Sequence, residues 1–171
     1  MKNLEITTDR LMITRFDESM AESVHLNSLD EDNRLFVPDE VFETVQEAKE
    51  LVMFLIECYK GTNGPFVYPV LLKSGENIGY VQAVPIDDDE WEVGYHIAKS
   101  YTRNGYASEA LKAFVPLIMK ELEIKQIWGI LRGDNIASCK VLENCEFSLD
   151  HSGIGNYHGQ NHEIRKYLYK V

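Results

Sequence analysis

The chain has 171 residues, of which 44% are hydrophobic and 26% are charged. These values are typical of one globular domain with its own core. The net charge of −11 argues against nucleic-acid binding as the main role, because phosphate contacts need clustered Lys and Arg. The charge favours a cationic partner such as an amine, and it means that any anionic cofactor must be held by local groups.

The sequence predicts neither a leader nor a membrane-spanning segment. Its start, MKNLEITTDR, is polar and charged, and the apolar run Leu51–Tyr59 is too short to span a membrane. Cys58, Cys139 and Cys145 contain no C-x-x-C spacing, so neither a disulfide framework nor a zinc site is indicated. We therefore expect a protein of the reducing cytoplasm, without a bound metal.

The first quarter of the chain predicts one strand and two helices. Residues Leu11–Phe16 alternate as in a strand, and a short edge strand precedes them. Asp17 can cap a helix, and the stretch Asn27–Phe42 after it is polar and irregular. A capping box with Thr44 then opens a longer helix with an apolar stripe.

Three antiparallel strands are predicted next, with turns between them. Residues 65–73 and 76–86 form a hairpin around Ser74 and Gly75. The acidic stretch Asp87–Glu90 forms a second turn, and residues 91–98 form the third strand. We expect the acidic turn to be solvated, with attraction of a cationic acceptor as the less favoured reading.

The second half predicts a helix, a strand, a short helix and two more strands. The first helix runs from Gly105 to about Leu122, with Pro116 expected to kink or break it. A strand follows at residues 125–132, then a helix at 135–144 and a strand at 145–153. Residues 153–161 (GIGNYHGQN) are predicted to be a flexible loop before the terminal strand. The order is that of a mixed α/β fold, and its β-α-β crossover requires at least one parallel strand pair.

The stretch His96–Phe114 joins a strand to a helix through a short polar loop. A helix that begins near Gly105 leaves its first N–H groups unpaired, and with the helix dipole these form an anion site. Arg103 and Lys99 add positive charge, and Ser108 adds a hydroxyl. The alternative is an ordinary strand-to-helix turn capped by water. This stretch alone favours the ordinary turn over an anion site, because it has no dinucleotide-binding or P-loop glycine pattern.

Three segments together give the chain a family resemblance. TTDRLMITRF matches an opening-strand pattern, YTRNGYASEAL matches a pyrophosphate-loop pattern, and NIASCKVLENCEF matches a helix pattern of N-x-x-S type. In this order and spacing, over nearly the whole chain, they resemble the GNAT superfamily of acyl-CoA-dependent N-acetyltransferases, closest to the branch of the ribosomal-protein N-acetyltransferases. The resemblance implies a single GNAT domain over residues 1–171, with a mixed central sheet of about six to seven strands and about four helices.

The resemblance also implies acetyl-CoA as co-substrate and assigns residues to it. The strand end at His96 and Ile97 is expected to run beside the pantetheine arm, which Asn135 would also bind. Ser138 would lie near the inner end of the cofactor, and Lys140 near the adenine. The residues expected to wrap the pyrophosphate with backbone N–H groups are Arg103, Asn104, Gly105, Tyr106, Ala107 and Ser108.

Three positions depart from the family patterns. Thr102 stands where Gln or Arg is usual, Arg103 where Gly is frequent, and Glu146 where the second helix motif has Gly. Because backbone groups bind most of the phosphate, we expect the first two to weaken nothing essential. Glu146 is expected to alter a turn rather than the chemistry.

Direct attack of an amine on a thioester needs a base, an oxyanion donor and a proton for the leaving thiolate. The strand period puts Glu92, Gly94 and His96 on one face, with room for a ligand. Glu92 is the candidate general base, acting through water, and a solvated or paired carboxylate is an equally weighted alternative. A strand bulge, frequent in the family, would change the parity beyond it and free an N–H near Ile97 as oxyanion donor.

The donor of the thiolate proton is less defined. Ser138 fits by position, and Tyr157 is a weaker candidate in a loop over the acceptor site. His158 and His162 are four residues apart, but they lack the helical H-E-x-x-H context of a metal site.

The leading function is an acetyl-CoA-dependent N-acetyltransferase acting on a primary amine, either a protein N-terminus or a small amine. The alternative is a CoA-binding module without catalysis, a sensor or partner protein, motivated by the three departures and the undefined proton donor. By analogy with the family, the protein is a possible homodimer. No nucleic-acid or membrane partner is expected.

Overall fold

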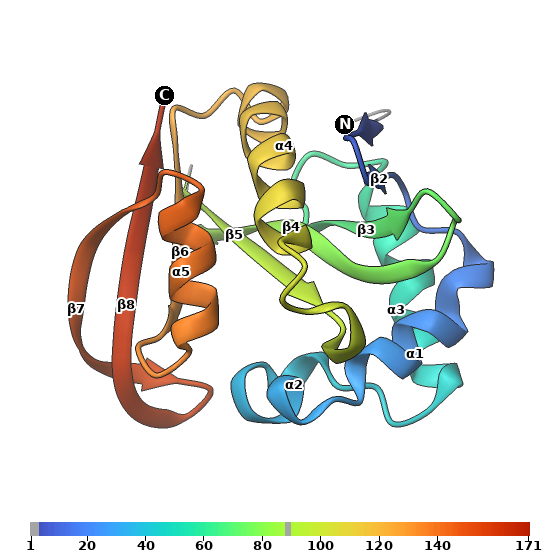
Figure 1. Ribbon diagram of the computed structural model, residues 1–171, viewed down its shortest axis with the longest axis horizontal. Coiled ribbons are helices and arrows are strands. Elements are labelled where there is room, and N and C mark those ends of the chain that lie inside the picture. Colours follow the sequence, from blue (N-terminus) through green and yellow to red (C-terminus); the bar gives the residue numbers. More distant parts are fainter. Residues whose placement is uncertain (1–3, 88–89) are drawn as a thin grey trace.

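The computed structural model describes residues 4–87 and 90–171, which form one mixed sheet with helices on both faces (Figure 1). The strands lie in the order β1-β2-β3-β4-β5-β6-β8-β7. Neighbouring strands are antiparallel except β5 and β6, which are parallel, so the predicted crossover is confirmed. The strands are β1 Ile6–Thr7, β2 Leu11–Ile13, β3 Phe66–Leu72, β4 Asn77–Asp87, β5 Glu90–Ile97, β6 Gln126–Arg132, β7 Ser148–Tyr157 and β8 Gln160–Lys170.

The helices cover the two faces of the sheet unequally. In Figure 1, α4 and α5 lie in front of the sheet, and α3 lies behind β3. The described part of the chain has eight strands and five α-helices, slightly more than expected from the sequence. None of these helices is long and apolar enough to cross a membrane. The helices are α1 Ala21–Ser28, α2 Glu31–Phe36, α3 Val45–Cys58, α4 Tyr106–Glu121 and α5 Ile136–Asn144, with 3₁₀ turns η1 Glu18–Met20, η2 Pro38–Glu40 and η3 Lys99–Tyr101.

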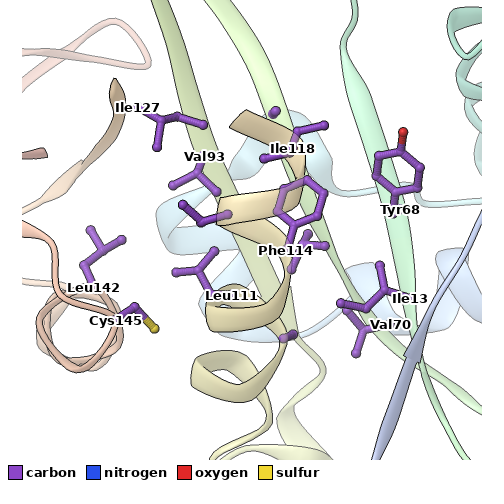
Figure 2. Packing of buried hydrophobic residues seen from close by; sticks show 14 of the residues in the cluster. Ile13, Tyr68, Val70, Val93, Leu111, Phe114, Ile118, Ile127, Leu142 and Cys145 are labelled. Carbon is purple, nitrogen blue, oxygen red and sulfur yellow. The ribbon is translucent and has the colours of Figure 1, made fainter. Parts of the chain in front are cut away.

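The main core lies between the sheet and α4. Leu111, Phe114 and Ile118 recur at helical spacing, are fully buried, and face the sheet (Figure 2). Alternate β3 residues such as Tyr68 pack in the same cluster, whereas Val67 packs toward α3 in a second, smaller one. Burial of each large apolar side chain contributes roughly 1.5–3 kcal/mol. This packing fixes the position of α4 and therefore of the loop that precedes it.

Helix α4 continues through Pro116, so a break at that residue does not occur. Pro116 lies on the exposed side of the helix, as does Lys112 one turn earlier. The carbonyl of Lys112, which loses its usual N–H partner, can therefore bind water. Buried apolar residues on both sides of Pro116 pack against the sheet, and this packing keeps the helix continuous.

The glycine-rich stretch at residues 153–161 is not a loop. Strand β7 extends through it to Tyr157, β8 begins at Gln160, and these two residues are partners in the register. The turn consists of His158 and Gly159, both with positive φ, at 47° and 81°. Two consecutive residues of positive φ are characteristic of tight hairpin turns. The sequence had predicted a loop because glycine weakens a strand pattern, and Gly153 and Gly155 lie within β7.

The stretch from Asn27 to Phe42 is more regular than predicted. It contains the end of α1, the short helix α2 and the 3₁₀ turn η2. The Asp30 carboxylate caps α2 by accepting a hydrogen bond from Asn33 N–H. The sequence did not predict this helix, because the whole stretch is polar and shows no apolar periodicity. Of the acidic turn at residues 87–90, residues 88 and 89 lie outside the described part of the chain.

The departure at Glu146 is explained by the end of α5. Phe147 N–H donates to Leu142 O and Glu146 N–H donates to Glu143 O, which is the Schellman pattern. Glu146 has φ 67°, in the left-handed region that favours glycine. The residue therefore belongs to a helix-ending turn.

Replacing Glu146 with Gly should stabilise the protein by about 1 kcal/mol, because glycine adopts the left-handed conformation without the Cβ strain. Thermal unfolding would then shift upward by roughly 2–4 °C. Glu146→Ala is the matched control, since it removes the carboxylate but keeps the Cβ. If alanine stabilises as much as glycine, backbone strain is not the cause.

Candidate active site

Strands β5 and β6 share one described residue pair, Glu92 opposite Trp128. Beyond this pair the strands separate, and Figure 1 shows β5 running diagonally away from β6. The register between β4 and β5 is regular from Trp91 to Ile97, so the alternation of side chains holds through His96. The gap between two parallel strands is the central feature of the site.

The edge of β5 that faces the gap presents backbone groups. Ala98 N–H donates to Ile78 O at 2.8 Å, on the β4 side. Because backbone groups alternate along a strand, Tyr95 and Ile97 direct their N–H and C=O groups to the opposite edge, toward the gap. His96, by contrast, pairs with Tyr80 of β4. Of the two residues predicted to contact a pantetheine arm, Ile97 therefore offers its backbone.

The loop that follows β5 has the geometry of an anion site. Gly105 is the N-cap of α4 with φ 78°, and it has no side chain that could accept from the first N–H groups of the helix. Arg103 also has positive φ, at 65°. The Asn104 side chain donates to the carbonyls of Tyr101 and Thr102, at 3.0 and 3.2 Å, which fixes the loop locally.

Helix α5 is tied to β5 across the gap. The Tyr95 hydroxyl donates to Ser138 O at 2.7 Å, and Asn135 Oδ1 accepts from Ser138 N–H at 3.2 Å. The structure thus brings the predicted pair Asn135 and Ser138 together in the first turn of α5, while Lys140 is exposed on the same helix. The sequence did not predict a role for Tyr95, whose side chain lies on the face opposite Glu92. Its hydrogen bond to α5 becomes evident only when the position of that helix is known.

Glu92 lies where the strands begin to separate. Burial raises the pKa of its carboxyl to about 7, even though a hydrogen bond from the Ile130 backbone acts in the opposite direction. The negative charge of Glu40 raises the pKa further. A carboxyl that titrates near neutrality is suited to accept a proton at physiological pH.

The space above Gly94 is filled by the chain itself. A Cβ at Gly94 would lie 2.5 Å from the Gln82 amide nitrogen, so glycine makes room for that side chain rather than for a ligand. The Gln82 amide donates to Glu40 at 3.3 Å, and the Tyr80 hydroxyl also binds Glu40. Glu40, in η2, was not predicted, because its approach to β4 depends on the fold of the preceding segment. Burial raises the pKa of Glu40.

His96 connects the sheet to α2. Its Nε2 lies 3.1 Å from Asp30 Oδ2, and its ring lies 5.8 Å from that of Tyr80. Burial opposes the ionisation of Asp30, but the hydrogen bonds from His96 and the Asn33 backbone outweigh it and lower the Asp30 pKa. The His96 side chain therefore positions the segment that carries Glu40.

The segment of α2 and η2 reaches the far side of the gap as well. Arg132 of β6 donates to Leu35 O at 3.2 Å and lies over the Phe36 ring at 5.2 Å. At the β7–β8 turn, His158 Nδ1 lies 2.6 Å from Asp39 Oδ2. The segment is therefore bound to both sides of the gap, on the Glu92 face of the sheet.

Tyr157 faces the same region from the end of β7. Burial raises the pKa of its hydroxyl to about 12, with further contributions from the charges of Glu92 and Glu40. The hydroxyl is therefore protonated at neutral pH. Two carboxyl groups and a phenol thus gather on one face of the gap, while the start of α4 and α5 lie on the other.

Comparisons with known proteins agree with this arrangement. The family model of the acetyltransferase (GNAT) domain matches residues 10–148. An uncharacterised N-acetyltransferase of Bacillus subtilis, YnaD, is 29% identical over 142 residues, which cover 82% of this chain and 80% of that protein.

Solved structures share the fold at low sequence identity. A GNAT-family acetyltransferase from Bacillus anthracis superimposes with a TM-score of 0.83 at 22% identity, covering 98% of both chains. RimL, a ribosomal L7/L12 alpha-N-protein acetyltransferase solved with coenzyme A, gives a TM-score of 0.84 at 21% identity, again over 98% of both chains. The fold is thus the GNAT fold. The chain belongs to the GNAT acetyltransferase family.

The raised pKa of Glu92 makes stability depend on pH. Between about 4.5 and about 7, the folded carboxyl keeps a proton that the unfolded chain has released, so stability falls as pH rises through this window. Glu92→Gln should therefore become more stable than the parent as pH rises from about 4.5 to about 8, by on the order of 3 kcal/mol.

Urea unfolding of the parent and the variant at both pH values measures this change. Glu50→Gln, at an exposed carboxylate on α3, is the control and should show no such divergence. A constant difference between Glu92→Gln and the parent at all pH values would contradict the burial of Glu92.

Proposed function

We propose that the protein is an acetyl-CoA-dependent N-acetyltransferase that transfers an acetyl group to a primary amine. One observation carries the proposal: the β5–β6 gap has a helix start without a side-chain cap on one face and a carboxyl with a pKa raised to about 7 on the other. A cofactor that enters from one face and an amine that enters from the other would meet in the gap.

The residues on the α4 side suit a phosphorylated cofactor. The first N–H groups of α4 and the backbone from Arg103 to Ser108 would bind a pyrophosphate, in spite of the net negative charge of the chain. The backbone C=O of Ile97 and the side chain of Asn135 would bind the amide groups of a pantetheine arm, and exposed Lys140 would lie near the adenine. Acetyl-CoA supplies the activated thioester.

Glu92 is suited to be the general base. An amine arrives protonated at neutral pH, and a carboxyl that titrates near 7 can take up its proton directly or through water. The Ile97 N–H, directed to the gap, is suited to donate to the oxygen that becomes negative during attack. The evenly weighted alternative, a solvated or paired carboxylate, is less favoured because burial has the largest effect on the pKa of Glu92 and outweighs the positive charge of Lys166.

Ser138 is the stronger candidate for donating a proton to the leaving thiolate. Its backbone N–H and C=O are bound by Asn135 and Tyr95, which fixes the backbone of Ser138 at the start of α5. Tyr157 lies with Glu92 on the other face, so it is better placed near the acceptor. Tyr95 donates to a carbonyl and acts as a positioning residue for Ser138.

The acceptor class can be narrowed by charge. Glu40 lies close enough to Glu92 to raise its pKa, so the acceptor side carries two acidic groups and favours a cationic amine. The similar structure of RimL is that of an enzyme named for the alpha-amino group of a ribosomal protein. A protein N-terminus is therefore the first acceptor to test, followed by small amines.

A thiol-release assay with acetyl-CoA and a panel of peptide N-termini and small amines tests the function. We expect turnover with at least one amine, identified by the mass shift of an acetyl group. Tight acetyl-CoA binding without turnover on any amine would favour the rival, a CoA-binding module without catalysis. Gly105→Val is the binding control: a β-branched residue at φ 78° strains the loop and should weaken acetyl-CoA binding at least tenfold.

The role of Glu92 predicts the pH dependence of the rate. The base must be ionised, so kcat/KM should rise with pH through an acidic limb near 7 and level off above it. Glu92→Gln should lower kcat by roughly 10²–10⁴ and remove this limb. The steady-state pH profile of both proteins measures the effect, and an acidic limb that persists in the variant would exclude Glu92 as the base.

A further inference from the structure

Arg10, at the start of β2, contacts the α4 loop from the side opposite the gap. Its Nε and Nη2 both lie 2.6 Å from Glu109 Oε2 in the first turn of α4. The other Glu109 oxygen accepts from the Thr8 hydroxyl at 2.6 Å and from the Arg10 backbone N–H at 3.1 Å. The turn before β2 therefore binds both oxygens of one carboxylate.

Glu109 is held in its charged form by these contacts. Partial burial would raise its pKa, but hydrogen bonds from Thr8 and Arg10 outweigh burial and lower it. Its two oxygens bind donors from separate parts of the turn, so the geometry is fixed more strongly than in a single surface ion pair. The start of α4 is thus anchored to β2, which is itself bound to β3.

Arg10 also binds the loop directly. Its Nη1 donates to Asn104 O at 2.9 Å, and its guanidinium lies 4.6 Å from the centre of the Tyr106 ring. In a trans peptide the C=O and the following N–H point in opposite directions. By holding the Asn104 carbonyl on the β2 side, Arg10 directs the Gly105 N–H away from itself, toward the side where an anion would bind.

Polar contacts of Arg10 connect the loop to β2, in addition to the apolar packing of α4 against the sheet. A surface cavity of about 520 Å³ lies between the two segments and is lined by Thr8, Asp9, Gly105, Ser108, Glu109 and Lys112. The core sets the position of α4, whereas the orientation of the Asn104–Gly105 peptide also depends on the side chains that bridge the two segments, and Arg10 makes most of these contacts.

We propose that Arg10 is a positioning residue for the cofactor: it orients the Asn104–Gly105 peptide and the start of α4 so that their N–H groups are ready for a pyrophosphate. The proposal rests on the acetyl-CoA dependence proposed above. Arg10 contacts the loop from the opposite side, so its effect is on the geometry of the free protein and on cofactor affinity, with little effect on the chemical step.

Three variants test this role by calorimetric binding of acetyl-CoA, steady-state kinetics and amide hydrogen exchange of residues 103–109. Arg10→Ala should weaken acetyl-CoA binding and raise its KM at least tenfold, leave kcat within about threefold, and accelerate exchange of the loop. Arg10→Lys keeps the charge but not the forked geometry, and it should recover little of the affinity. Arg34→Ala is the matched control, because Arg34 has the same side-chain exposure, 47%, and binds Glu43 away from the loop.

The outcomes separate this proposal from the function on which it rests. If the parent does not bind acetyl-CoA, the proposed function fails, and unchanged exchange in Arg10→Ala would still overturn the positioning role. If the parent binds acetyl-CoA and Arg10→Ala binds it equally well, only the positioning role fails. Full recovery by Arg10→Lys would also overturn it, since attraction by charge would then suffice. Should Arg10→Ala not fold, Glu109→Gln removes the same ion pair and carries the same expectation.

Discussion

The separation of β5 from β6 is the constraint on which both halves of the site depend. Each strand is held from its outer side, β5 by β4 and β6 by β8, while the two share the pair Glu92–Trp128 among described residues. At the point of separation the Glu92 carboxylate accepts a hydrogen bond from the Ile130 backbone, in place of a ladder bond between the strands. Unpaired backbone groups are costly when buried without partners, so the gap is suited to a ligand that supplies hydrogen bonds.

The gap also divides the chemistry between the two faces of the sheet. On one face, the start of α4 presents N–H groups without a side-chain cap, which favour negative charge. On the other face, Glu40 and Glu92 are half-buried, burial raises the pKa of both, and the charge of Glu40 raises the pKa of Glu92 further. The two faces of the sheet therefore suit ligands of opposite charge on either side of the β5–β6 gap. The overall negative charge does not conflict with the proposed phosphorylated cofactor, because the uncapped N–H groups and the dipole of α4 would act locally.

Local patterns predicted the features that local interactions determine. The strand alternation placed Glu92 and His96 on one face, and the helix caps at Thr44 and Asn135 are as predicted. Features that depend on distant contacts were missed: Glu40 reaches the site through α2 and η2, and Tyr95 gains its role from α5. The β7–β8 hairpin was predicted as a loop because glycines weaken a strand pattern, although pairing with β8 stabilises the strand. The roles of the individual site residues stay predictions.

The departures from the family patterns are informative about which atoms the site uses. Arg103 and Glu146 stand where glycine is frequent, and both have left-handed backbones, so the backbone conformation is kept although the side chain has changed. A non-glycine residue in this region costs roughly 1–2 kcal/mol. Around Arg103, hydrogen bonds from the Asn104 side chain and from Arg10 to the loop carbonyls offset that cost. These contacts, and not the side chains of Thr102 and Arg103, hold the backbone of the loop, so the two departures are compatible with the proposed anion site.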